Sequence, residues 1–303
     1  MEILMTLITT PTGNIGGQVL TNLLKTNEDL RVLMRDASKL PAAARGKVDV
    51  IEGSLDDSEA VARALRGAQQ LFLIIPPSQT YKNVNDYYLN FSNIICTALK
   101  NEKIKRVVFI SGTGLGFEKN AGPVSAAFLV EEQLKATEVD LRILHCGSFM
   151  ENLFHSVTPI QMRSQFGTTV PGDVKIPWVA TQDIAAVAAN LLLDKSWTRQ
   201  SAVGILGPQD LSYNEIAKII SAVLKKEITY ATIPADAYVG MLKQFGSSEA
   251  AAKDLVDLYS SMTKGTFCRV ERNATNSSPT GFQDWCERIL KPMIENKVRC
   301  KSR

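Results

Sequence analysis

The hydrophobic positions in the first half of the chain form short runs of β-branched and aliphatic residues, separated by longer segments with helical periodicity. Between the first two runs, Ile15, Val19 and Leu23 recur every four residues and predict a helix, as do the patterns over 58–67 and 84–103. The runs themselves predict strands over residues 2–9, 30–35, 48–52, 70–75, 106–111 and 139–145. Strands that alternate with crossover helices indicate an α/β fold with a Rossmann-type, doubly wound parallel sheet.

The pattern changes after about Gly147. Residues 149–179 are aromatic, rich in proline and glycine, and only partly periodic, which predicts a smaller, mostly helical C-terminal lobe. Residues 181–194 predict a helix capped by Asp183. Further elements are expected as a strand over 202–208 that returns to the sheet and helices over 212–226, 235–262 and 279–294. We therefore expect a sheet domain over residues 1–150, completed by about 182–207, and a discontinuous lobe over 151–303.

The composition limits the classes of protein to consider. With 303 residues, 45% hydrophobic and 21% charged, the chain predicts a folded globular protein of one large or two smaller domains. The net charge of +3 arises in the last thirteen residues, which hold five bases and one acid, so no basic face for nucleic acid is indicated. Uncharged runs fall short of the roughly 18 residues that span a bilayer, so no membrane partner is expected.

Histidine and cysteine are too few and too scattered for a metal site. There are two histidines and five cysteines, without a CxxC pair or an HExxH helix. Because Cys96 and Cys146 lie in apolar segments and the cysteine count is odd, we expect reduced thiols and a cytoplasmic protein.

The segment TTPTGNIGG, residues 9–17, carries the clearest chemistry. It follows a predicted strand and opens a predicted helix. Glycine at such a turn lets the backbone approach a pyrophosphate, and the helix N-terminus offers unpaired N–H groups and a positive dipole. A plain glycine turn is the alternative. The segment predicts a dinucleotide cofactor bound by Thr10, Thr12, Gly13, Asn14, Ile15 and Gly16.

The second predicted strand ends in Arg35, with Lys39 four residues further on. An acid at this strand end would bind a ribose 2′-hydroxyl, whereas a guanidinium suits a 2′-phosphate. The pair therefore favours NADP(H) over NAD(H), although Asp36 is adjacent and Arg35 could be an ordinary surface residue.

In these motifs the chain resembles the NmrA-like family, atypical members of the short-chain dehydrogenase/reductase superfamily. The resemblance rests on Thr10-x-x-Gly13-x-x-Gly16, on Arg35, and on an ordered series of segments: GSLDD at 53–57, LFLIIPPS at 71–78, VVFISG at 107–112, GSFMEN at 147–152, IPWVATQDIAAVA at 176–188 and LGPQDLSYNEIA at 206–217. It is nearest to quinone- or azo-reductase-like and alkaloid-pathway reductase members. The resemblance implies further cofactor contacts from Ser54, Leu55, Ile75, Pro76 and Pro77.

Three departures from the family pattern bear on function. Thr10 occupies the place of the first glycine, where a β-branched residue disfavours a positive φ, so cofactor affinity is expected to be weakened. Ser54 stands where the family commonly has an acid. The superfamily's Tyr-x-x-x-Lys pair is missing from residues 122–136, in which Ala127 or Phe128 falls near the usual lysine and Glu131 matches a family glutamate.

Without tyrosine and lysine, the candidate catalytic residues are Ser111, at the end of the fifth strand, and His145, at the end of the sixth. Ser111 could bond a substrate or the nicotinamide amide, or only local backbone. His145 could donate a proton or be a structural group, and Cys146 beside it is expected to be inert. An apolar substrate pocket is expected from Phe149, Asn152, Phe154, Trp178 and Phe267, although core packing explains each equally well.

Two functions follow as leading hypotheses. The first is an NADPH-dependent reductase that passes hydride to a conjugated, quinone-like or iminium small molecule, since such acceptors need little proton donation. The second is a non-catalytic NADP-binding redox sensor that acts through a regulatory protein partner. A scaffold that has lost cofactor binding rests on Thr10 alone. The sequence leaves the natural acceptor and the oligomeric state open.

Overall fold

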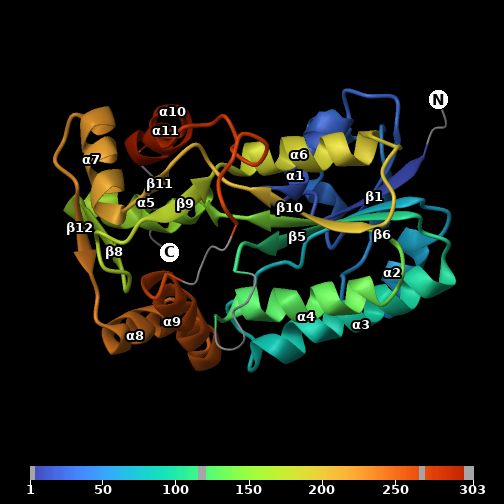
Figure 1. Cartoon of the computed structure of the whole chain (residues 1–303), viewed down its shortest axis with the longest axis horizontal. Helices are drawn as coiled ribbons and strands as arrows, with labels where there is room; N and C mark the ends of the chain where they lie inside the picture. Colours follow the sequence, from blue (N-terminus) through green and yellow to red (C-terminus); the bar gives the residue numbers. More distant parts are fainter. Residues whose placement is uncertain (1–3, 115–120, 266–269, 297–303) are drawn as a thin grey trace.

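The computed structural model describes residues 4–114, 121–265 and 270–296 of the chain. A seven-stranded sheet lies at its centre, between layers of helices (Figure 1). All pairs in this sheet are parallel, in the order β10-β6-β5-β4-β1-β2-β3. The strands are β1 (Met5–Thr9), β2 (Asp29–Met34), β3 (Asp49–Glu52), β4 (Gln70–Leu73), β5 (Arg106–Gly112), β6 (Asp140–Cys146) and β10 (Gln200–Ile205). The strand order reverses between β1 and β4, and such a switch point opens a ligand crevice at the carboxyl ends of the strands.

Helices cover both faces of the sheet (Figure 1). One layer holds α1 (Gly16–Leu23) and α6 (Thr181–Leu193), and the other holds α2 (Ser58–Leu65), α3 (Val84–Asn101) and α4 (Pro123–Lys135). Side chains alternate along β5, so Val108 and Ile110 pack with the first layer while Val107 and Phe109 pack with the second. Two short 3-10 helices, η1 (Ala37–Lys39) and η2 (Ala42–Ala44), connect β2 to β3. The predicted α/β, Rossmann-type fold is confirmed.

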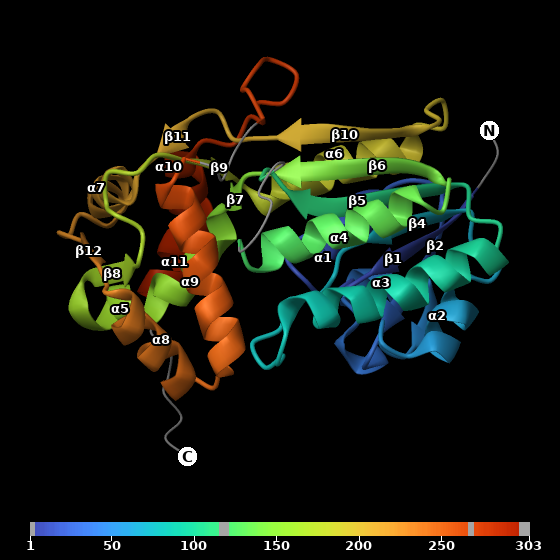
Figure 2. The same cartoon turned by 60° about the horizontal axis from the view of Figure 1, so that its bottom comes forward.

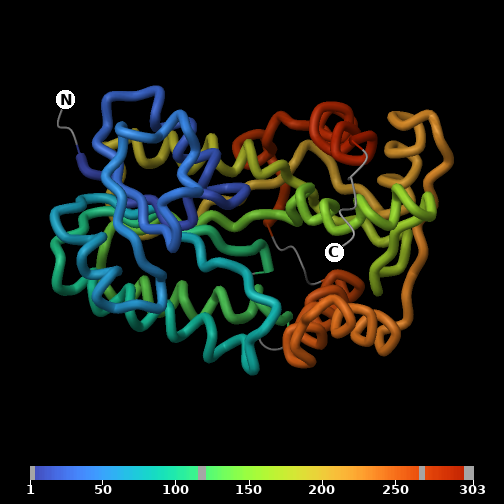
Figure 3. The backbone as a smooth tube through the Cα atoms, turned by 180° about the vertical axis from the view of Figure 1, so that it is seen from behind, coloured from blue at the N-terminus to red at the C-terminus, as the bar shows by residue number. Residues whose placement is uncertain are grey.

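The lobe beyond the strand ends has its own core and two small sheets (Figure 2). Figure 3 shows the path of the backbone through the same lobe from behind. One sheet joins β7 (Ser148–Phe149), β9 (Ile176–Val179) and β11 (Asp210–Leu211), and the other pairs β8 (Gln165–Thr168) with β12 (Thr229–Thr232). Neither sheet was predicted from the sequence. The lobe helices are η3 (Met150–Ser156), α5 (Val157–Arg163), α7 (Tyr213–Leu224), α8 (Ala235–Gln244), α9 (Glu249–Thr263), α10 (Phe282–Trp285), the π-helical η4 (Cys286–Leu290) and α11 (Lys291–Glu295).

The segment over 235–262, where the sequence predicts helical structure, forms the two helices α8 and α9. Ser248 caps α9 by accepting from the Ala251 N–H at 3.1 Å, and it also donates its hydroxyl to the Tyr81 carbonyl at 2.6 Å. The Ser248 N–H donates to the Gln79 carbonyl at 2.7 Å. The α8–α9 hairpin is therefore hydrogen-bonded to the loop that follows β4.

The predicted cap of α6 is wrong. Asp183 is the third residue of the helix, where its carboxylate accepts from the Thr280 N–H at 3.0 Å and the Thr280 hydroxyl at 2.8 Å. The first N–H of the helix, at Thr181, donates instead to buried Glu151 at 3.0 Å.

Across the residues that the structure describes, none of the helices combines the length and the hydrophobicity that crossing a membrane requires.

Candidate nicotinamide cofactor site

The glycine turn joins β1 to α1 at the crevice. Thr10 adopts φ +50°, the positive value that the sequence led us to expect at this position, and the Gly13 N–H donates to the Thr10 carbonyl at 2.9 Å. A Cβ on Gly16 would lie 2.4 Å from that same carbonyl oxygen, so only glycine fits where the helix starts. The turn is therefore formed with threonine in the first position.

The N-terminus of α1 is available to an anion. Ile15 precedes the helix without a side-chain cap, and the first turn contains no acid. The Gly17 and Gln18 N–H groups donate to the Gly13 and Ile15 carbonyls at 2.9 and 3.0 Å, so an anion at the positive end of the helix dipole would be bound by the turn that precedes them. Among the predicted contacts, Thr12, Gly13 and Asn14 are exposed, whereas Ile15 and Gly16 are buried beneath them. This arrangement fits a pyrophosphate held by backbone N–H groups.

Arg35 directly follows β2 and is exposed. Within the described ranges no carboxylate pairs with its guanidinium. Burial raises the pKa of the Tyr87 phenol, and the positive charge of Arg35 opposes that rise. The Asp36 carboxylate is engaged by the Ser38 N–H at 3.0 Å and by the Ser38 hydroxyl, which lower its pKa. Lys39 lies 3.5 Å from Asp36. Arg35 is therefore the freer of the two predicted cations.

The other predicted cofactor contacts lie on two loops at the same sheet edge. Ser54 is half-buried, but the Leu55 side chain points into the core, so that only its backbone could face a ligand. Ile75 is likewise a core residue. Pro76 is half-buried with its carbonyl accepting from the Tyr87 hydroxyl at 2.9 Å, and Pro77 is exposed.

The two candidate catalytic residues share one buried partner, Glu131 on α4. Ser111 donates its hydroxyl to Glu131 Oε1 at 2.5 Å, and His145 Nε2 lies 3.1 Å from the same oxygen. Ser111 and His145 are paired across β5 and β6, and all three residues are buried. The structure thus brings Ser111 and His145 together but holds His145 away from solvent. Burial raises the pKa of the adjacent Cys146 thiol, which disfavours a reactive thiolate.

The predicted pocket residues of the lobe divide into several groups. Phe149 and Phe154 are half-buried, Asn152 is exposed, and Phe154 stacks on Trp285 with ring centroids 6.0 Å apart. Trp178 does not line an open crevice, because it is only 1% exposed, donates to the Leu211 carbonyl at 2.9 Å and packs in the lobe core. Phe267 lies outside the described residues.

Sequence reasoning missed Glu151 as an organising residue. Besides capping α6, its buried carboxylate accepts from Trp285 Nε1 at 3.0 Å, so one side chain joins η3, α6 and α10. No local pattern marks it, since its partners lie 30 and 134 residues away.

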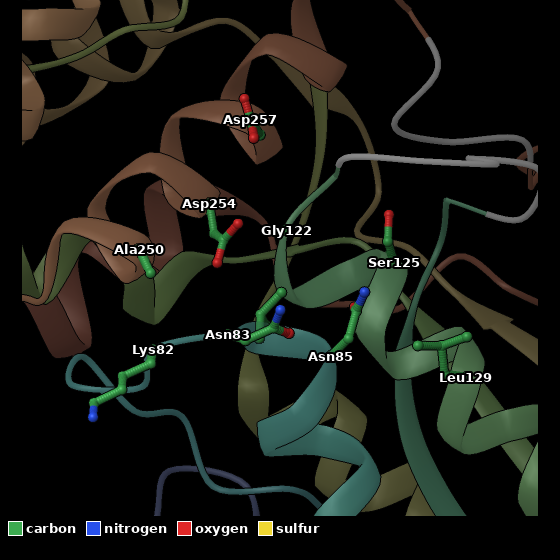
Figure 4. Close-up of a pocket in the computed structure, with 10 residues that line it drawn as sticks. Lys82, Asn83, Asn85, Gly122, Ser125, Leu129, Ala250, Asp254 and Asp257 are labelled. Carbon is green, nitrogen blue, oxygen red and sulfur yellow. The ribbon is translucent and has the colours of Figure 1, made fainter.

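A separate cavity of about 310 Å³ lies where α9 meets the starts of α3 and α4 (Figure 4). Burial raises the pKa of its Asp254, as does the neighbouring Asp257, while a hydrogen bond with Tyr81 opposes them. The residues that line the cavity are polar for the most part and include none of the predicted cofactor or substrate contacts. No cluster of three metal-ligating side chains occurs in the described part of the chain.

Known proteins resemble this chain in sequence and in fold. The chain is 27% identical over 259 residues to an NAD(P)H azoreductase of Xenophilus azovorans, covering 84% of this chain and 86% of that protein. It is 27% identical to festuclavine synthase I of Penicillium roqueforti, covering 76% and 78%. The fold is also that of an Escherichia coli NADPH-dependent quinone oxidoreductase solved with NADPH, with a TM-score of 0.77, 20% identity and coverage of 93% and 98%.

The family itself follows from the sequence match along the chain. The model of the NmrA-like family matches residues 5–278, which include the glycine turn, every strand of the large sheet and most of the lobe. The chain therefore belongs to the NmrA-like family, as the ordered motifs of its sequence indicate.

Proposed function

We propose that this protein is an NADPH-dependent reductase that transfers hydride to a conjugated, quinone-like or iminium small molecule. Relatives named NAD(P)H azoreductase, festuclavine dehydrogenase and festuclavine synthase support the general class, a nicotinamide-dependent oxidoreductase. The preference for NADPH and the class of acceptor are inferred from the residues of the site.

The residues at the crevice fit a dinucleotide with a 2′-phosphate. The uncapped N-terminus of α1 suits the pyrophosphate, and Gly16 leaves the space that a Cβ would fill. The exposed guanidinium of Arg35 suits a 2′-phosphate through paired, charge-assisted hydrogen bonds. When bound, the cofactor supplies a hydride from its nicotinamide ring.

The observation that supports the acceptor class is the scarcity of proton donors among the described residues at the ends of β5 and β6 and on α4. Helix α4 contains no tyrosine, and its one lysine, Lys135, lies in the last turn and bonds Glu132 at 2.8 Å. Ser111 and His145 both direct their polar atoms to Glu131. An unactivated ketone needs a proton as hydride arrives, a step that general acids accelerate by about a hundredfold or more. An electrophilic acceptor needs mainly orientation, with water supplying the later proton.

The test is fluorescence titration with NADPH and NADH, followed by turnover with quinones, a cyclic iminium salt and a simple ketone. We expect tighter binding of NADPH, consumption of NADPH with the activated acceptors, and none with the ketone. Equal binding of both cofactors would contradict the 2′-phosphate role. Rapid reduction of the ketone would contradict the acceptor class.

The same lack of proton donors favours a second function, a redox sensor that binds NADP without turnover and signals through a protein partner. The titration separates the two. A sensor binds NADPH and NADP⁺ with different affinity and consumes neither with any acceptor of the panel.

A further inference from the structure

A buried carboxylate on α4 lies behind the last residues of β5 and β6. Glu131 is 2% exposed, and its partners Ser111 and His145 are 6% and 2% exposed. Taking an ionised carboxylate out of water is unfavourable unless its lone pairs are satisfied. Here Oε1 receives both partners, at 2.5 Å and 3.1 Å, and Oε2 lies 3.9 Å from the ammonium group of Lys135.

The direction of these hydrogen bonds fixes what Ser111 can offer to a ligand. A carboxylate only accepts, and a serine hydroxyl has one hydrogen to donate. Because that hydrogen is directed to Glu131, the Ser111 oxygen has only lone pairs left for a ligand. Ser111 can therefore accept a hydrogen bond in the crevice, but it cannot donate one.

The sheet order indicates which part of the cofactor would meet this acceptor. Ser111 is the second-last residue of β5, and β4 alone separates β5 from β1 and its glycine turn. At about 4.8 Å per strand, Ser111 is roughly 10 Å along the sheet edge from the pyrophosphate turn. Arg35 follows β2, on the opposite side of β1. A dinucleotide extended along this edge, with its 2′-phosphate at Arg35, would have its nicotinamide near the end of β5, where Ser111 lies.

We infer that Glu131 is a positioning residue: by taking the Ser111 hydrogen, it presents the serine oxygen as the acceptor for the carboxamide NH₂ of the nicotinamide. His145 supports this role by bonding the same carboxylate oxygen from the neighbouring strand. The inference rests on the proposed function, and it assigns Ser111 to orienting the cofactor rather than to protonating the substrate.

The experiment compares ligands that share the adenosine half but differ in the nicotinamide. Dissociation constants for NADPH and for 2′-phospho-ADP-ribose are measured by calorimetry on Ser111→Ala, Glu131→Leu, Glu131→Gln and the double variant S111A/E131L. Glu132→Gln is the matched control, because it removes a carboxylate that is 73% exposed one residue away on the same helix.

We expect Ser111→Ala and Glu131→Leu each to weaken NADPH binding by about three- to tenfold, the effect of one hydrogen bond. The double variant should match the single ones, since Glu131 acts through Ser111. Glu131→Gln should bind NADPH within about twofold of the unchanged protein, because its amide oxygen still accepts the serine hydrogen. No variant should alter the binding of 2′-phospho-ADP-ribose by more than about twofold.

Equal weakening of both ligands would overturn the inference, because it would show that Glu131 only maintains the fold. Additive losses in the double variant, or unchanged NADPH binding in Ser111→Ala, would also overturn it. If Glu131→Leu does not fold, the contrast between Ser111→Ala and Glu131→Gln decides. A protein that binds neither ligand without any substitution would overturn the proposed function as well, which separates that failure from the failure of this inference.

Discussion

Substitution of Arg35 by alanine tests the cofactor preference through a single side chain. Paired, charge-assisted hydrogen bonds between a guanidinium and a phosphate contribute roughly 1.5–3 kcal/mol, equivalent to about 10- to 150-fold in affinity. Arg35 is exposed, so salt screens its charge and the lower end of that range applies. We expect Arg35→Ala to weaken NADPH binding by about 10- to 20-fold at physiological ionic strength and to leave NADH binding within about twofold.

The assay is fluorescence titration with each cofactor at two salt concentrations. Lys39→Ala is the matched control: Lys39 is 73% exposed and already lies near Asp36, so its loss should change NADPH binding by about twofold or less. The difference between Arg35→Ala and the unchanged protein should shrink at high salt. An equal loss of NADPH and NADH affinity in Arg35→Ala would refute the 2′-phosphate contact, since NADH has no phosphate at that position.

Three further substitutions test the turn and the lobe. Gly16→Ala places a Cβ 2.4 Å from the Thr10 carbonyl oxygen, so it should lower the free energy of unfolding by roughly 1–3 kcal/mol in urea titration and abolish NADPH binding. In Gly17→Ala the new Cβ lies 3.1 Å from its nearest neighbour, and the free energy of unfolding should fall by less. Thr10→Gly removes the cost of a positive φ at threonine, about 1–2 kcal/mol, but it adds about 0.5–1 kcal/mol of chain entropy to the unfolded state, so thermal stability should change little. A tenfold gain in NADPH affinity would show that the threonine impedes cofactor binding. Glu151→Leu leaves two buried N–H groups unpaired and should cost roughly 3 kcal/mol in urea titration, and an unchanged midpoint would contradict its role.

The parts of the fold that the sequence predicted depend on local signals. Each strand of the large sheet contains aliphatic or β-branched residues in a short run. The spacing of Ile15, Val19 and Leu23 identifies α1, because such periodicity follows from helix geometry. The small sheets of the lobe lack such a signal. In β9 the four residues include Pro177, and its partner β11 begins more than 30 residues later.

The missed features of the site depend on contacts between distant residues. Asp183 has the residue type of a cap and lies close to the helix start, but it is the third residue of α6, and the buried carboxylate of Glu151 reaches the helix start from η3. Trp178 lies in an uncharged run, and the sequence cannot specify whether its ring faces the crevice or the core. The sequence identifies Ser111 as a candidate and Glu131 as a match to the family pattern, but their hydrogen bond depends on the packing of α4 on β5.

The proposed reductase transfers hydride from NADPH to an activated acceptor without a proton-donating tyrosine and lysine. The most direct measurement is the loss of NADPH absorbance in a single turnover, with enzyme-bound NADPH mixed with a small quinone or with a simple ketone. We predict rapid oxidation by the quinone and none by the ketone. Bound NADPH that no activated acceptor oxidises, or that the ketone oxidises as fast as the quinone, would contradict this mechanism.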